Sequence, residues 1–378
     1  MMRHLRTATA KGWLQMTKPY VSVAITQHGV EIARRLQDVL IDTDVYYPMK
    51  FARGDESSRG VHMYEGPVAQ YVPEWFGRYE GVIGIFSIGT MVRLIAPLLH
   101  DKKTDPAVVV VDDRATYAIS VLSGHLGGAN QLTLQVAQYL GAKPVITTAS
   151  DVNETLAVDL LGREFGWEIE NFDQVTTVSA AVVNEERVHI IQEAGERNWW
   201  PYEKPLPPWL RVYVSAEQAL QEPFDAALVI TPRLLTPFEE EQLLARGVLY
   251  RPKVIVIGVG CNRGTTKEEM ESMLLQTLQC LRLSERSVRN LATIDIKQNE
   301  QGLVALSQER GWPIVAYTAA ELNQIVLPHP SKTVYHYVGT WGVCEPAARL
   351  SSGAKDWVLE KLKSGNVTIS VCMVGADE

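Results

Sequence analysis

Short, continuous apolar runs alternate with helical stretches along most of the chain. Ala107–Val111 is entirely apolar, and Val82–Phe86 and Val254–Ile257 are similar runs that lead into polar turns. Strands that are apolar at successive positions suit a sheet that is covered on both faces. Strands that alternate with helices of roughly 10 to 15 residues predict βαβ units and a mostly parallel sheet. The predicted fold class is therefore α/β.

At 378 residues the chain is long enough for two or three domains, each with its own core. We expect mostly parallel, helix-covered sheets in an N-terminal and a C-terminal domain, with a smaller α/β domain between them. The expected boundaries are 1–17 for a flexible extension, 18–152 for the N-terminal domain, 153–250 for the middle domain and 251–378 for the C-terminal domain. Within them the patterns predict helices at 154–165 and 345–362 and a strand at 333–337.

The composition excludes several classes of protein. A net charge of −8 is not that of a nucleic-acid-binding protein, whose binding surface is strongly basic. No apolar run approaches the roughly 18 residues that span a bilayer. The four cysteines form no C-x-x-C pair, so they indicate free thiols in a reducing cytoplasm and neither a zinc site nor a redox motif.

The segment from 119 to 153 carries the most information about a site. An apolar strand runs into a loop with three glycines (Gly124, Gly127, Gly128) and His125, and a helix follows. Glycine lets a ligand approach the backbone closely, and a helix N-terminus favours an anion. The loop is therefore predicted to bind an anionic ligand, with Asn130 or nearby N–H groups as donors. The alternative is a tight strand-to-helix turn with a partly exposed histidine.

Other strand ends carry polar residues that fit either a ligand or a local turn. Thr90 and Asp151 fit helix N-caps, and Asp112 could orient His125 or cap the next turn. The spacing Gly258-x-Gly260-x-x-x-Gly264 differs from a dinucleotide fingerprint by one residue, and no acid follows at the required distance. We interpret it as an anion-facing turn with Arg263 beside it.

Several blocks together resemble one family. Leu122-Ser-Gly-His-Leu-Gly-Gly-Ala-Asn130 and Pro144-Val-Ile-Thr-Thr-Ala-Ser-Asp-Val-Asn153 resemble the CbiG family, the cobalt-precorrin-5A hydrolases of anaerobic cobalamin biosynthesis. Gly258-Val-Gly-Cys-Asn-Arg-Gly264 and Val343-Cys-Glu-Pro-Ala-Ala348 resemble its C-terminal domain, which the protein CobE contains alone. The resemblance extends from about residue 20 to the end of the chain, and it is weakest in the middle region.

The resemblance implies a hydrolase that acts on a carbon–carbon bond. It would open the δ-lactone of cobalt-precorrin-5A with water and release acetaldehyde, giving cobalt-precorrin-5B. The substrate is an anionic corrinoid that carries its own cobalt, so no cofactor and no protein-bound metal are expected. Nucleic acid and membrane are not expected partners, whereas a homodimer or contact with other enzymes of the pathway is. The expected location is the cytoplasm.

The predicted catalytic residues are His125, Ser123 and Glu345. His125 would deprotonate water or bind cobalt axially, and the N–H groups of Gly127–Ala129 would stabilise the oxyanion. The predicted substrate-binding residues are Gly89, Thr90, Arg93, Asp112, Gly124, Gly127, Gly128, Asn130, Thr147, Thr148, Gly258, Gly260, Asn262, Arg263 and Lys297. Two other classes stay open: a non-catalytic corrinoid carrier or scaffold of the pathway, and a nicotinamide- or adenosylmethionine-dependent enzyme that uses the 258–264 turn.

Overall fold

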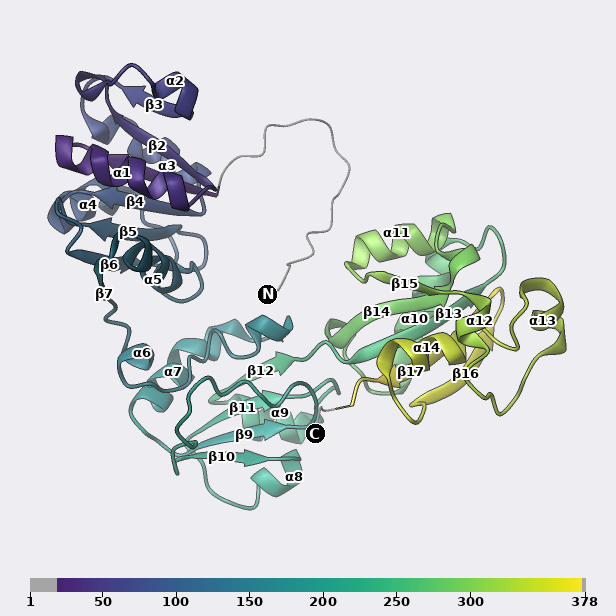
Figure 1. Ribbon diagram of the computed structural model, residues 1–378. Helices are drawn as coiled ribbons and strands as arrows, with labels where there is room; N and C mark the ends of the chain where they lie inside the picture. The colour runs from purple at the N-terminus through teal and green to yellow at the C-terminus, as the bar shows by residue number, and fades with distance from the viewer. Residues whose placement is uncertain (1–18, 376–378) are drawn as a thin grey trace. The chain divides into compact units, whose positions relative to one another are not determined.

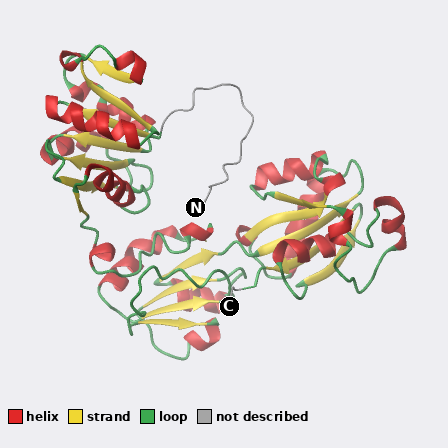
Figure 2. Cartoon of the chain, viewed as in Figure 1, coloured by secondary structure: helices red, strands yellow, loops and turns green. Residues whose placement is uncertain are grey.

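Three β-sheets organise the computed structural model, which describes residues 19–375 (Figure 1). The chain divides after Asn153 into two compact units, of which the first holds one sheet and the second holds two. Helices cover the faces of the sheets (Figure 2). The α/β class is thereby confirmed. The extension expected at 1–17 lies outside the described residues.

The first unit contains a seven-stranded sheet in the order β3-β2-β1-β4-β5-β6-β7. Strands β1 to β5 are parallel to one another, whereas β6 is antiparallel to β5 and parallel to β7. The strands are β1 (Tyr20–Ala24), β2 (Thr43–Pro48), β3 (Val61–Tyr64), β4 (Gly81–Ile85), β5 (Ala107–Val111), β6 (Tyr117–Leu122) and β7 (Lys143–Val145). The helices are α1 (Gln27–Val39), α2 (Glu56–Arg59), α3 (Val72–Arg78), α4 (Ile88–Ile95), α5 (Ala129–Leu140) and α6 (Ala149–Val152), with single 3₁₀ turns η1 (Met49–Phe51), η2 (Val68–Gln70) and η3 (Ala96–Leu98).

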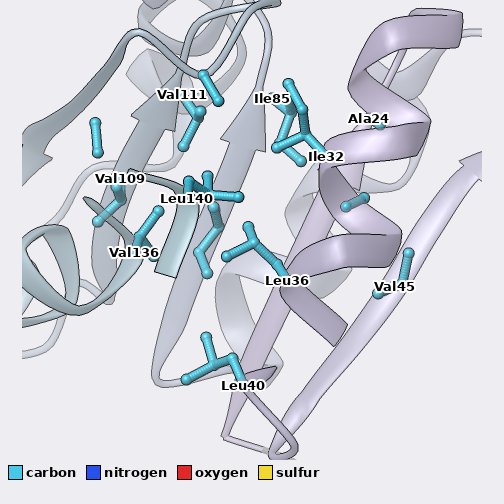
Figure 3. Close-up of a cluster of buried hydrophobic side chains, with 14 of the residues drawn as sticks. Ala24, Ile32, Leu36, Leu40, Val45, Ile85, Val109, Val111, Val136 and Leu140 are labelled. Atoms are coloured by element: carbon cyan, nitrogen blue, oxygen red, sulfur yellow. The ribbon is translucent and has the colours of Figure 1, made fainter. Parts of the chain in front are cut away.

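Each face of this sheet has its own core. Helices α1 and α5 pack on one face, where Leu36 of α1, Val136 of α5 and Val109 of β5 belong to one cluster of buried side chains (Figure 3). Helices α3 and α4 pack on the other face against Val108 and its neighbours. Successive residues of β5 point to opposite faces, so an entirely apolar strand is what two covered faces require.

The second unit begins with the middle domain, a five-stranded sheet in the order β10-β9-β11-β12-β8. Only β8 is antiparallel to its neighbour. The strands are β8 (Glu168–Ile169), β9 (Val188–Gln192), β10 (Leu210–Tyr213), β11 (Ala226–Ile230) and β12 (Gly247–Arg251). The helices are α7 (Val175–Val183), α8 (Ala216–Ala219) and α9 (Pro237–Leu244), with η4 (Arg163–Phe165) and η5 (Phe172–Gln174).

The C-terminal domain contains a five-stranded sheet in the order β15-β14-β13-β17-β16. Strands β13, β14 and β15 are parallel, and β17 and β16 are antiparallel to their neighbours. The strands are β13 (Ile255–Cys261), β14 (Val288–Ile294), β15 (Ile314–Tyr317), β16 (Leu359–Ser364) and β17 (Val367–Met373). The helices are α10 (Lys267–Cys280), α11 (Gln301–Arg310), α12 (Ala319–Leu322), α13 (Lys332–Val338) and α14 (Cys344–Ser352), with η6 (Glu285–Ser287) and η7 (Asp295–Lys297). Backbone hydrogen bonds, such as Leu234 N to Arg282 O at 2.7 Å, connect this domain to the middle domain.

Three predicted elements are wrong. Residues 154–165 form turns and one 3₁₀ turn because Glu154 and Gly162 adopt positive φ, which interrupts a helix. Residues 333–337 belong to a helix, α13, which Ser331 caps at its start and Gly339 ends in a left-handed conformation. The helix expected at 345–362 ends at Ser352, and its last part is the exposed strand β16. Within residues 19–375, no helix is both long and apolar enough to cross a membrane.

Candidate functional site

The antiparallel strand β6 divides the predicted site residues of the first unit between two edges of its sheet. Leu122, the last residue of β6, pairs with Val108 near the start of β5. The loop after β6 therefore lies at the edge opposite to the loops that follow β1, β4 and β5. His125 and Thr148 lie at one edge, while Thr90 and Asp112 lie at the other. The predicted substrate-binding residues of the first unit therefore do not all lie at one edge of its sheet.

The imidazole of His125 has two side-chain partners on helix α6. Its Nε2 lies 2.9 Å from Oδ2 of Asp151 and 3.1 Å from Oγ of Ser150. The His125 side chain is only 15% exposed, whereas that of Asp151 is 41% exposed. The interaction thus places a carboxylate that reaches solvent against a largely buried imidazole. Asp151 was absent from the predicted site because its position before Glu154 fitted a helix cap.

Ser150, His125 and Asp151 do not form a serine-hydrolase relay. In that relay the serine and the aspartate occupy opposite nitrogens of the imidazole. Here both contact Nε2, so the hydroxyl and the carboxylate share one ring atom. The arrangement is a histidine–aspartate pair, and it does not provide an activated serine.

Asn130 holds the carboxylate of Asp151 in place. Its Nδ2 donates to Asp151 Oδ2 at 2.9 Å and to Thr148 Oγ1 at 3.0 Å, while its Oδ1 accepts from Ser120 Oγ at 2.7 Å. Asn130 is buried, so these contacts fix the orientation of its amide group. The predicted residues Asn130 and Thr148 therefore belong to one hydrogen-bond network with His125, whereas the side chain of Thr147 is exposed beside it.

The glycines of the His125 loop serve local packing. A Cβ at Gly127 would overlap Ser123, a Cβ at Gly124 would lie 2.8 Å from Oδ1 of Asn130, and Gly128 has a φ of +85°. The amides of Gly128, Ala129 and Asn130 donate to the carbonyls of His125, Ser123 and Gly124, at 2.9, 3.0 and 3.0 Å. Two of the three predicted oxyanion donors, the amides of Gly128 and Ala129, are thus already used inside the loop.

Ser123 is also committed to the structure of the loop. Its hydroxyl donates to the carbonyl of Asp105 at 2.9 Å, and its backbone has a φ of +57°. A positive φ is uncommon outside glycine. These two observations favour a structural role for Ser123 over the predicted catalytic one.

A second histidine–aspartate pair lies at the opposite edge of the same sheet. His28 Nδ1 is 3.1 Å from Asp113 Oδ2, and the hydroxyl of Thr26 donates to Oδ1 of the same carboxylate. The side chain of His28 is 80% exposed. His28, the second residue of α1, was not predicted, whereas Asp113, which with Asp112 follows β5, fitted either a partner of His125 or a cap of the next turn.

The other predicted residues at this edge have mainly local roles. Asp112 accepts from the amides of Arg114 and Tyr117. Partial burial raises the pKa of Asp112, but these amide donors outweigh it and bring the pKa below the usual value. Gly89 and Thr90 lie in the first turn of α4, where the Thr90 amide donates to Ser87 Oγ. The guanidinium of Arg93 is exposed and has no hydrogen-bond partner among the described residues.

In the C-terminal domain, the predicted residues of the 258–264 turn contribute to packing and to a polar strand end. A Cβ at Gly258 would overlap the Cys344 carbonyl, and one at Gly260 would lie 2.6 Å from Thr368 Oγ1, so both glycines permit close approach of neighbouring elements. Asn262 pairs with Asn366 through backbone and side chain, at 3.0 and 2.9 Å.

Two cations lie at the same strand ends. Lys297 Nζ donates to Glu300 Oε1 at 2.8 Å, and Glu300 Oε2 accepts from the Gly264 amide at 3.3 Å. The hydrogen bond from Lys297 lowers the pKa of Glu300, with further help from the amide of Gly264 and the charge of Arg263. Arg263 itself is exposed and has no hydrogen-bond partner within residues 19–375.

Glu345 is buried and has partners inside its own domain. Its Oε2 accepts from Cys344 Sγ at 3.0 Å, and Lys361 Nζ lies 3.4 Å from Oε1. Burial raises the pKa of the Cys344 thiol, and the neighbouring carboxylate raises it further. These contacts favour a structural role for Glu345 over the predicted acid–base role. Across the described part of the chain, no group of three or more histidine, cysteine or acidic residues is placed to hold a metal ion.

Comparison with known proteins identifies relatives along most of the chain. Three family models match: Cobalamin synthesis G N-terminal at residues 70–151, Cobalamin biosynthesis central region at 156–252 and Cobalamin synthesis G C-terminus at 255–372. The chain is 52% identical to cobalt-precorrin-5A hydrolase of Priestia megaterium, over 95% of this chain and 96% of that protein. It is 32% identical to the enzyme of the same name from Salmonella typhimurium, over 92% and 95% of the two chains. A solved structure of a cobalamin biosynthesis protein G homolog from Sulfolobus solfataricus is 20% identical, covers 95% of this chain and 98% of that one, and gives a TM-score of 0.35.

Proposed function

The chain belongs to the CbiG family of cobalt-precorrin-5A hydrolases, and we propose that it performs the hydrolysis with His125 and Asp151 of its N-terminal unit. Its role as a hydrolase of cobalamin biosynthesis follows from the 52% identity to the Priestia enzyme over nearly the whole of both chains. The observation that supports the choice of site is the interaction of His125 Nε2 with Asp151 Oδ2 at 2.9 Å.

The pair has the properties that activation of water requires. A neutral imidazole accepts a proton near neutral pH, and an adjacent carboxylate stabilises the imidazolium that results. Asn130 keeps the carboxylate in place through its own hydrogen bond to Oδ2. Asp151 is therefore the residue that positions and stabilises His125, and Asn130 positions Asp151.

The proposed reaction consumes one water and cleaves two bonds. Water adds to the lactone carbonyl while His125 takes its proton, and the carbonyl re-forms as the lactone C–O bond breaks and the alkoxide receives that proton. The carbon that bears this hydroxyl becomes the carbonyl carbon of acetaldehyde when its bond to the macrocycle breaks. The electron pair of the broken carbon–carbon bond stays on the ring, where the substrate's cobalt withdraws electron density, and the hydroxyl proton restores the charge balance. No redox partner is needed, so we propose that the protein uses no cofactor.

The rim of the substrate carries several carboxylates, which need cationic or N–H donors. We propose Arg263 and Lys297 for this role, because both lie at the strand ends of the C-terminal sheet and Arg263 has no hydrogen-bond partner within the described residues. Two broader expectations also stay proposals: association as a homodimer, which light scattering measures, and a location in the cytoplasm, which cell fractionation measures.

The test is anaerobic incubation of the full chain with cobalt-precorrin-5A and an assay for acetaldehyde. His125→Ala is expected to bind the substrate and to lose at least about 100-fold in the rate of acetaldehyde release, the usual contribution of a general base. The matched control is His28→Ala, which removes the other histidine of a histidine–aspartate pair from the opposite edge of the same sheet. Full activity of His125→Ala would remove this histidine from the chemistry, and binding by the wild-type protein without acetaldehyde would identify a carrier.

A further inference from the structure

Residues 323–343 form an excursion from the C-terminal sheet, which we call the aromatic flap. It follows β15 and α12, and Val343 at its end lies 3.7 Å from the position of a Cβ on Gly260, near the end of β13. Strand β14 lies between β13 and β15 in the sheet. The flap therefore extends from the carboxyl end of β15 to the carboxyl end of β13. Its helix α13 projects from the body of the domain (Figure 1).

The flap has a defined internal structure. The Asn323 side chain donates to the Gly339 carbonyl at 2.8 Å and accepts from the Trp341 amide at 3.3 Å. The Ser331 amide donates to the Trp341 carbonyl at 2.8 Å. These bonds join the two ends of the excursion, so its side chains are presented by a closed loop.

Large apolar side chains of this closed loop face solvent. Val326 is 85% exposed and Tyr337 is 79% exposed, and Tyr335 and Trp341 stack on each other with ring centroids 4.3 Å apart. Single exposed apolar residues are normal, but a group of them on an ordered segment marks a binding surface. Ile296, which is 61% exposed, adds apolar surface at the end of the intervening strand β14.

Cationic side chains accompany this apolar surface. Lys297 follows Ile296 directly, and Arg263 follows β13 at the same edge of the sheet. A ligand that suits both features has flat apolar faces and an anionic rim. A lipid surface would need a larger cluster of cations, and Glu300 and Asp295 beside Lys297 do not favour one.

We propose that the aromatic flap binds one face of a corrin macrocycle, while Arg263 and Lys297 contact carboxylates of its rim. This proposal rests on the proposed function, since it takes the substrate class from there and assigns its recognition to the C-terminal domain. The aromatic side chains remove the ring face from water, and the two cations distinguish a corrin with free carboxylates from one whose carboxylates are amidated.

Binding to the flap can be measured separately from hydrolysis. The full chain is titrated with cobyrinic acid, a cobalt corrin with free rim carboxylates, and the shift in the visible spectrum of the corrin gives Kd. Tyr337→Ala is expected to raise Kd about tenfold, a factor that corresponds to about 1.4 kcal/mol of lost contact. Tyr337→Phe keeps the ring and is expected to bind as the wild-type protein does. The control Phe238→Ala removes a 62% exposed aromatic ring from the middle domain and is expected to leave Kd unchanged.

The outcomes separate this proposal from the proposed function. Steady-state kinetics with cobalt-precorrin-5A should show a raised KM and an unchanged kcat for Tyr337→Ala, the signature of lost uniform binding. An unchanged Kd and KM in Tyr337→Ala would overturn the flap proposal while the hydrolase activity of the wild-type protein stands. A Tyr337→Ala variant that binds the corrin normally but loses self-association in sedimentation would show that a second copy of the chain covers the flap, which also overturns it. Because Tyr337 is mostly exposed, its replacement does not disturb the core.

Discussion

The imidazole of His125 and the carboxylate of Asp151 meet at 2.9 Å although helix α5 and strand β7 separate them along the chain. The contact connects the glycine-rich loop after β6 to the short helix after β7. Strands β6 and β7 are parallel, so the segments that follow them lie at the same edge of the sheet. The pairing is therefore a consequence of topology, because an antiparallel β7 would place the segment that follows it at the opposite edge of the sheet.

Replacing Asp151 by asparagine tests its role as the positioning residue of His125. The amide keeps the size of the side chain but no longer stabilises an imidazolium, so kcat for acetaldehyde release is expected to fall about 100-fold with little change in KM. Steady-state assays over a range of substrate concentration separate the two parameters. Asp113→Asn, at the other histidine–aspartate pair, is the matched control, and equal losses in both variants would contradict the assignment.

Asn130→Ala should lower both stability and activity. It removes the donor to Asp151 Oδ2 and leaves the hydroxyl groups of Ser120 and Thr148 without this buried partner. The expected decrease in the free energy of unfolding is about 1 to 3 kcal/mol, measured by urea denaturation. Ser120→Ala removes only the outer bond of the network and should retain most of the activity. Wild-type kcat in Asn130→Ala would show that Asp151 needs no support.

Two glycine substitutions distinguish packing from ligand contact. Gly127→Ala places a Cβ against Ser123 and is expected to cost about 1 to 3 kcal/mol of stability. Gly89→Ala meets no atom within 4 Å and lies in helix α4, where alanine is favoured over glycine by up to about 1 kcal/mol. Thermal unfolding of both variants checks these signs. A stable Gly89→Ala protein with a raised KM would instead show that a ligand approaches the backbone there.

Glu345→Gln should affect stability more than catalysis. The glutamine loses the charge opposite Lys361 and keeps only one oxygen that can accept from Cys344, and the partial loss of a buried polar contact costs about 1 to 3 kcal/mol. We expect kcat to stay within about twofold of wild type, since the carboxylate has internal partners. A 100-fold loss of kcat in a protein of normal stability would restore Glu345 to the chemistry.

The buried His189 gives a pH dependence of folding. Burial lowers the pKa of its imidazole below 6.5, although a hydrogen bond to the Ala219 carbonyl partly opposes the shift. The native protein then binds fewer protons than the unfolded chain. The contribution of neutral His189 to stability is therefore fully present above pH 6.5, and it decreases as the pH falls through that value toward the folded pKa. Urea denaturation of the wild-type protein between pH 7.5 and 5 should show this loss, and His189→Leu should show less of it. Parallel pH profiles for the two proteins would contradict the prediction.

The sequence predicted the α/β class and several strands because continuous apolar runs are a strong signal. Ala107–Val111, for example, coincides with β5. The direction of β6 was not predicted, although the sequence contains a signal for it. Only residues 112–116 separate β5 from β6, and a connection between parallel strands needs about a dozen or more residues. The short connection requires an antiparallel pair, and this decides which site residues share an edge.

Asp151 and the flap helix were missed for local reasons. The sequence around Asp151 fits the cap of a helix at 154–165 as well as it fits a strand-end site, but the positive φ of Glu154 ends the regular structure there. The β-branched and aromatic residues of 333–337 predicted a strand, yet Ser331 and Gly339 provide a start and an end for a helix. In both cases the residues at the ends of the element outweighed the composition inside it.

The position of Asp151 close before the division of the chain at Asn153 has a practical consequence. A fragment that stops at 153 keeps the residues that form the hydrogen bonds between His125, Asp151 and Asn130, whereas one shortened by five residues loses Asp151. Dividing the protein at that point would thus yield a piece that keeps these hydrogen bonds and lacks the aromatic flap, so that the proposed hydrolysis and the proposed corrin binding could be studied separately.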